Sequence, residues 1–156
     1  MSDNLPNVEE FAELLCSLLG DDIQVKPGDG IDPTAAAVKA FYVDSDGVPA
    51  KCIACDVEFA NAVGAALTKI PPPTVEAANK ANEVPDNIYE NFYEVLNICV
   101  NAFPSNSTKH VVLGNVVTPG REAGATDIKP EGSPVTFAVD IPRYGVGTVA
   151  LTQLSS

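Results

Sequence analysis

The segment Asn91–Phe103 (NFYEVLNICVNAF) carries polar side chains at spacings that could serve chemistry. Glu94 and Asn97 stand three residues apart, and Asn101 follows one turn later. On a helical wheel at about 100° per residue, these three residues and Glu90 gather on one arc, opposite an apolar stripe. A carboxylate can pair with a cation, and an amide can hydrogen-bond without titrating. The polar arc is therefore either an ordinary solvated face or a functional site.

The composition of this arc favours the functional interpretation. It holds no Lys or Arg, so ion pairs between residues one turn apart do not account for its carboxylates. Asparagine is a mediocre helix former, and two of them on one exposed face reduce helix stability without an obvious packing gain. The alternative is that the arc is simply the acidic surface of an acidic protein.

The elements that would position this segment can be predicted from apolar periodicity and turn residues. Helices are expected at Asn7–Leu19, Phe59–Ile70 and Asp86–Phe103. Strands are expected at Ile23–Lys26, Val38–Val43, Val48–Val57, Val111–Val117, Val135–Ile141 and Gly147–Leu154. Residues 71–85 read as a linker or a short helix, and residues 121–132 as a polar loop. Short hairpins imply antiparallel strands, so we expect an α+β domain with an antiparallel sheet and helices packed on one face.

Two parts of the chain resemble each other. Phe11–Cys16 (FAELLC) and Phe92–Asn97 (FYEVLN) share the pattern Phe-x-Glu-x-Leu. Each is followed by a strand that ends in Val-x-Pro-Gly, at Val25–Gly28 and at Val117–Gly120. The shared order predicts duplicated helix–strand units related by a pseudo-twofold axis. The alternative is coincidence, since Phe-x-Glu-x-Leu is a common helix pattern.

Length and charge narrow the functional classes. The chain has 156 residues, 46% of them hydrophobic, which predicts a single domain over residues 1–156. Its net charge of −12 makes nucleic acid and anionic membrane poor partners and suits a basic or metal-loaded one. No run of apolar residues is long enough to span a membrane, and the acidic N-terminus does not resemble a signal peptide. We therefore expect a cytoplasmic protein.

Three other motifs favour structural roles. Cys52 and Cys55 form a CxxC within a predicted strand, where residues three apart point to opposite faces, so core packing is expected rather than zinc or redox chemistry. The Asp44–Gly47 turn (DSDG) lacks the later Glu of a calcium-binding EF-hand loop. His110 is the sole histidine, and no catalytic triad or paired-histidine metal motif can be built around it. No metal site on this chain is expected.

With its surrounding elements, the Glu94–Ile98 segment (EVLNI) resembles the Glu-x-x-Asn helix of the CheC/CheX chemotaxis phosphatases. The leading helix, the VKPG turn, the hairpin before an Ala-rich helix and the closing hairpin are similar too. The resemblance covers most of the chain. It implies hydrolysis of the aspartyl phosphate on a CheY-like response regulator, in chemotaxis or two-component signalling.

The resemblance also implies roles for the site residues. Glu94 would pair with the active-site lysine of the regulator, and Asn97 would hold a water in line with the phosphorus. Glu90 and Asn101 would contact the partner on the same face. No covalent intermediate would form on this protein. It would need no cofactor of its own, because the magnesium belongs to the regulator.

The first helix departs from the two-site pattern of CheC-type members. It carries Glu13 and then Cys16, where the family motif has Asn. A single site is therefore expected, as in CheX-type members, which often form homodimers. Val100 and Asn101 follow the motif where Gly or Ala is frequent in the family. Two alternatives to the phosphatase function remain. One is a non-catalytic binding module for a receiver domain or a chemosensory or flagellar partner. The other is a structural domain whose polar helix face is merely solvated.

Overall fold

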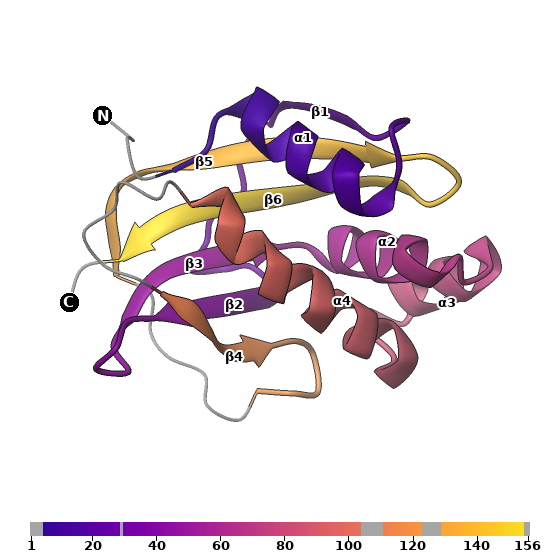
Figure 1. The fold of residues 1–156 in the computed structure, drawn as a ribbon. Coiled ribbons are helices and arrows are strands. Elements are labelled where there is room, and N and C mark those ends of the chain that lie inside the picture. Colours follow the sequence, from indigo (N-terminus) through magenta and orange to yellow (C-terminus); the bar gives the residue numbers. More distant parts are fainter. Residues whose placement is uncertain (1–4, 29, 104–110, 123–128, 155–156) are drawn as a thin grey trace.

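Four helices lie over one face of a six-stranded sheet in the computed structural model (Figure 1). The structure describes residues 5–28, 30–103, 111–122 and 129–154. In chain order the elements are α1 (Val8–Leu19), β1 (Gln24–Pro27), β2 (Val38–Val43), β3 (Pro49–Cys55), α2 (Val57–Thr68), α3 (Pro72–Lys80), α4 (Asp86–Cys99), the 3₁₀ helix η1 (Val100–Ala102), β4 (Val112–Val117), β5 (Pro130–Ile141) and β6 (Gly145–Leu154). The α+β class is confirmed.

The order of the strands reveals the duplication. The sheet runs β1-β5-β6-β3-β2-β4, and every neighbouring pair is antiparallel. Exchanging β1 with β4, β2 with β5 and β3 with β6 gives the same order read from the other edge. Each half begins with a helix, α1 or α4, then an edge strand, then a hairpin. The pseudo-twofold axis therefore passes between β3 and β6, and α1 and α4 occupy equivalent places.

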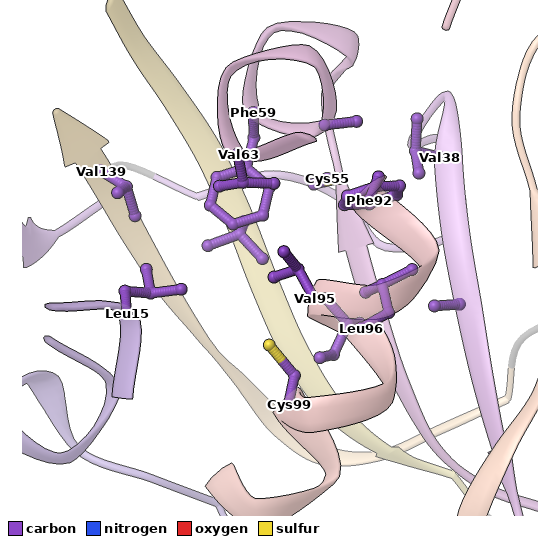
Figure 2. Close-up of a cluster of buried hydrophobic side chains, with 14 of the residues drawn as sticks. Leu15, Val38, Cys55, Phe59, Val63, Phe92, Val95, Leu96, Cys99 and Val139 are labelled. Carbon is purple, nitrogen blue, oxygen red and sulfur yellow. The ribbon is translucent and has the colours of Figure 1, made fainter. Parts of the chain in front are cut away.

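The main hydrophobic core lies between the sheet and the helices. Figure 2 shows Phe92, Val95, Leu96 and Cys99 of α4 directed toward the strands and α2. A smaller cluster of buried side chains occupies the opposite face of the sheet, with Phe41 and Cys52 among its members. Cys55 belongs to the main core and Cys52 to the smaller cluster, so the two thiols of the CxxC point to opposite faces. That geometry matches the packing role and is incompatible with a shared metal.

Caps explain where the helices begin. Asn7 and Glu10 form a reciprocal capping box at the start of α1. Asp56 caps α2 by accepting from Phe59 N at 2.8 Å, so this helix starts two residues earlier than periodicity alone predicts.

Two predicted connecting segments contain regular structure. Residues 71–85, interpreted as a linker or a short helix, contain α3. Strand β5 starts within the predicted polar loop, of which residues 123–128 lie outside the described residues, as does His110.

The Asp56 carboxylate also accepts from Thr148 N of β6, at 3.1 Å to Oδ2. Burial raises the pKa of the Asp56 carboxyl above its ordinary value of 3.8, against hydrogen bonds from Phe59 and Thr148 that lower it. The folded state therefore binds this proton more tightly than the unfolded state. The contribution of Asp56 to the free energy of unfolding should fall as pH rises from 3.8 through the raised pKa. Urea titrations at several pH values across this range give the free energy of unfolding. Its decrease with rising pH should be smaller in Asp56→Asn than in the wild-type protein. The same pH dependence in both proteins would contradict a raised pKa of Asp56.

No helix in the described part of the chain is long and apolar enough to cross a membrane.

Candidate functional site

Helix α4 presents the predicted site residues to solvent. Ile88, Phe92, Val95, Leu96 and Cys99 are buried against the core. Glu90, Glu94 and Asn97 are exposed on the opposite side of the helix. The predicted helix to Phe103 ends its α-helical part at Cys99 and continues as the 3₁₀ turn η1, where Asn101 is exposed. The structure thus places all four predicted residues on exposed positions along one helix and its extension.

One flank of α4 is fixed to α2. The Asn91 amide donates to Gly64 O at 3.0 Å and to Thr68 Oγ1 at 2.8 Å. Gly64 allows this close approach, because a Cβ there would lie 2.6 Å from Ile88 O. Beneath the helix, the buried Tyr42 hydroxyl of β2 donates to Leu96 O at 2.6 Å. These contacts hold the backbone on both sides of Glu94.

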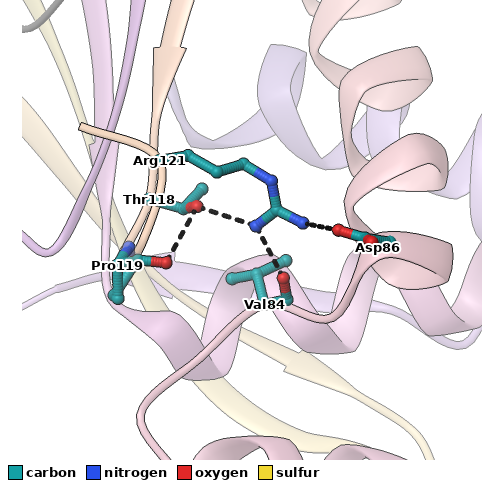
Figure 3. Close-up of polar contacts among 5 residues, drawn as sticks. All are labelled: Val84, Asp86, Thr118, Pro119 and Arg121. Carbon is teal, nitrogen blue, oxygen red and sulfur yellow. Dashed lines mark hydrogen bonds and ion pairs between the residues drawn. The ribbon is translucent and has the colours of Figure 1, made fainter. Parts of the chain in front are cut away.

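The opposite flank is fixed by Arg121, which follows the VTPG turn after β4 (Figure 3). Its Nη1 donates to Val84 O at 2.7 Å and to Thr118 Oγ1 at 3.1 Å. Its Nη2 pairs with Asp86, the first residue of α4. The N-terminus of α4 has no side-chain cap, and Arg121 links the start of the helix to the turn after β4.

Two tyrosines continue from Arg121 along this flank. The guanidinium Cζ lies 4.1 Å from the centre of the Tyr89 ring, and the Tyr89 and Tyr93 rings are 6.3 Å apart. Tyr89 is half-buried and packs against the core, whereas Tyr93 is 37% exposed. Burial raises the pKa of Tyr89, opposed by the charge of Arg121. Tyr89 is therefore a neutral hydrogen-bonding group near pH 7.

The exposed face of α4 is acidic. Asp86, Glu90 and Glu94 lie on the helix, and α4 itself contains no basic residue. Carboxylates on this face suit a partner that brings a positive charge to it. Asn97 adds a neutral amide that can donate and accept hydrogen bonds.

The equivalent face of α1 offers different chemistry. Glu13 is exposed, but Cys16 turns its thiol back to the loop after its own helix, 3.5 Å from Ile23 O. Since α1 and α4 are related by the pseudo-twofold arrangement, Cys16 takes the place that Asn97 has in the second half. The first half therefore carries the carboxylate without the amide.

Two pockets lie in the described part of the structure, away from Glu94 and Asn97. One, of about 360 Å³, is at the start of α4 and is lined by Pro85, Asp86, Pro119, Gly120 and Arg121 among others. Another lies between the ends of α1 and α2 and the β5–β6 hairpin. Neither is lined by Glu94 or Asn97. The candidate site is a docking face on a helix, suited to a macromolecular partner.

The fold recurs in solved structures, among them a chemotactic CheC-like protein and a chain of a CheX–CheY complex. A chain in the CheX–CheY–BeF₃–Mg²⁺ complex from Borrelia burgdorferi matches with a TM-score of 0.52 and 13% identity, covering 94% of both chains. A chain in the FliM–SpeE complex from H. pylori matches with a TM-score of 0.58 and 8% identity, covering 94% of this chain and 81% of that one. A CheC-like protein from Shewanella oneidensis matches at 0.50 and 12%, covering 94% and 92%. The chain therefore has the fold found in the CheC/CheX family.

Sequence comparison adds no assignment. No protein-family model matches the chain, and no curated protein matches it at a significant level. At these identities the structural likeness establishes the fold alone. The chemistry must therefore be argued from the residues on α4.

Sequence reasoning missed the supports of the site. Asn91, Arg121 and Tyr89 make the contacts that fix α4, and none of them was assigned a role from the sequence. The pair Tyr89 and Tyr93, one turn apart and beside the polar arc, was an available signal. Arg121, directly after the repeated Val-x-Pro-Gly turn, was another.

Proposed function

We propose that this protein dephosphorylates the aspartyl phosphate of a CheY-like response regulator. The observation that carries the proposal is the joint exposure of Glu94 and Asn97 on one face of a helix that has no basic residue of its own and is fixed on both flanks. The fold supports it, because the same fold occurs in a CheX–CheY complex. The helix α4 would dock over the phosphorylation site of the regulator.

In this reaction the residues of this chain position groups and form no bond to phosphorus. The Asn97 amide oxygen accepts a hydrogen bond from a water and holds it opposite the aspartyl leaving group. The water oxygen bonds to phosphorus while the bond from phosphorus to the aspartyl oxygen breaks, giving a carboxylate and inorganic phosphate. Aspartyl phosphate is already reactive, so fixing one water supplies much of the required acceleration. The regulator brings its own magnesium.

The direct test is the loss of phosphate from phosphorylated receiver domains with and without this protein. Candidate receivers from the same organism are phosphorylated with acetyl phosphate, and free reagent is removed before the decay is followed. A faster decay with at least one receiver is the expected result. A receiver that binds tightly but decays at its own rate would contradict the enzymatic function.

Glu94 should act mainly in docking. Glu94→Gln keeps the shape of the side chain and removes the charge that would pair with the lysine of the regulator. We expect KM to rise about tenfold, in line with the loss of a charge-assisted contact of roughly 1.5–3 kcal/mol. The measurement is steady-state dephosphorylation at several salt concentrations. The KM of the wild-type protein should rise with salt more steeply than that of the variant; equal salt slopes would refute an ionic role.

A second candidate is a binding module that recognises a receiver domain or a flagellar partner without hydrolysis. The likeness to a chain of the FliM–SpeE complex shows that this fold also occurs in another type of assembly. Val100 and Asn101 favour this alternative, because they follow the motif where small residues are frequent in the CheC/CheX family, and Asn101 is exposed on η1. Binding without acceleration in the decay experiment would select this alternative.

A further inference from the structure

Tyr93 is a large aromatic side chain that is 37% exposed on α4. Large hydrophobic side chains exposed in the described part of the chain include Val48, Val112, Val146 and Tyr93. Tyr93 is the aromatic member of this group, and it lies on α4 one turn before Asn97. Tyr89, one turn earlier, already packs against the core on that flank. Sealing the core therefore does not require Tyr93.

The ring of Tyr93 lies next to Tyr89, which is itself held in place by Arg121. Arg121 is held by Val84 O and Thr118 Oγ1 and lies against Tyr89, whose ring is next to Tyr93. A supported aromatic side chain loses little conformational freedom when a partner covers it, which strengthens its contribution to binding. Tyrosine is also among the residue types that dominate interface energetics.

Tyr93 also has the right position. At about 100° per residue, Tyr93 and Asn97 are separated by about 40° around the helix, with Glu94 on the far side of Asn97. A partner that places a phosphorylated group over Asn97 and a lysine against Glu94 must cover Tyr93 in the same contact. The neighbouring carboxylate of Glu90 adds to an acidic surround that favours a lysine-bearing partner.

We propose that Tyr93 is the apolar anchor by which α4 docks on a receiver domain, beside the phosphorylated aspartate. This inference rests on the proposed function and adds the residue that sets affinity for the partner. The division of roles is specific: Tyr93 contributes to binding, Glu94 to ionic orientation and Asn97 to the chemical step. In the proposed step Tyr93 neither holds the attacking water nor bonds to phosphorus, so its substitution should leave kcat nearly unchanged.

The test separates binding from turnover. Affinity is measured by titrating a receiver domain loaded with beryllofluoride and Mg²⁺, and kcat and KM are measured with the same receiver phosphorylated. Tyr93→Ala should weaken affinity and raise KM at least about tenfold, with kcat within about twofold of wild type. Tyr93→Phe should bind nearly as wild type, because it keeps the ring. Val146→Ala, which removes an exposed apolar side chain at the start of β6, serves as the matched control.

Each outcome has a distinct meaning. Unchanged affinity and KM in Tyr93→Ala, with turnover abolished in Asn97→Ala, would overturn the anchor role and leave the proposed function intact. Weakened affinity in Tyr93→Ala without turnover by the wild-type protein would support the anchor and overturn the phosphatase assignment. No binding by the wild-type protein to any receiver would overturn both. These outcomes apply if the melting temperature of Tyr93→Ala is close to that of the wild-type protein. If Tyr93→Ala does not fold, Tyr93→Ser is measured in its place.

Discussion

Asn97→Ala is expected to reduce kcat for dephosphorylation at least about 100-fold while leaving affinity for the receiver nearly unchanged. The amide is exposed and contributes no contact to the core, so its removal should not unfold the helix. What is lost is the group that holds the attacking water, and loss of positioning has effects of about this size. Single-turnover decay with saturating protein measures the chemical step, and titration with the beryllofluoride-loaded receiver measures affinity.

Asn101→Ala is the matched control for this prediction. It removes the same amide one turn further along, from an exposed position on η1. Its kcat should stay within about twofold of wild type, with at most a modest rise in KM. Equal losses of kcat in both variants would show that Asn97 has no special position. Unchanged turnover in Asn97→Ala would remove the water-positioning role outright.

Gly64→Ala is expected to destabilise the protein by about 2–3 kcal/mol. The added Cβ would lie 2.6 Å from Ile88 O and 2.7 Å from Ile88 Cγ2, so α4 must shift away from α2. At an exposed helix position the same change would stabilise by roughly 0.5–1 kcal/mol, so the sign is diagnostic. The melting temperature should fall by roughly 4–12 °C for a domain of this size.

The displacement of α4 in Gly64→Ala should also change the position of Glu94. Asn91 donates to the carbonyl of Gly64 itself, so a shift there disturbs the flank that carries Glu94. Glu76→Ala, on the exposed side of α3, is the control and should change the free energy of unfolding by no more than about 0.5 kcal/mol. A Gly64→Ala variant as stable as wild type would show that the helices cross less tightly than the structure indicates.

The fold was predictable because the same sequence pattern occurs in both halves of the chain. The repeated Phe-x-Glu-x-Leu and Val-x-Pro-Gly patterns predict equivalent halves, and the strand order around β3 and β6 confirms them. The exposed arc of α4 was equally visible, because a helix of 3.6 residues per turn separates Glu94 and Asn97 from Phe92 and Leu96. The positions of Cys52 and Cys55 followed from the alternation of a strand.

The supports of the site were not predictable from local patterns. Arg121 meets Val84 and Asp86 only because β4 returns beside α4, a contact across 35 residues between Arg121 and Asp86. Nothing in the local sequence distinguishes Asn91 from other polar residues. Its role depends on Gly64, which lets α2 approach closely enough to accept a hydrogen bond from the Asn91 amide. The extent of β5 was also missed, since its first residues are Pro, Glu and Gly, which are rare in strands. Long-range pairing outweighed local propensity in each case.

The proposed phosphatase activity is tested most directly by the first-order decay of a phosphorylated receiver domain at increasing concentrations of this protein. The rate constant should rise with protein concentration and saturate, and the saturating value should fall at least about 100-fold toward the intrinsic rate in Asn97→Ala. A rate constant that stays at the intrinsic value when the receiver is fully bound would contradict a phosphatase activity of this protein.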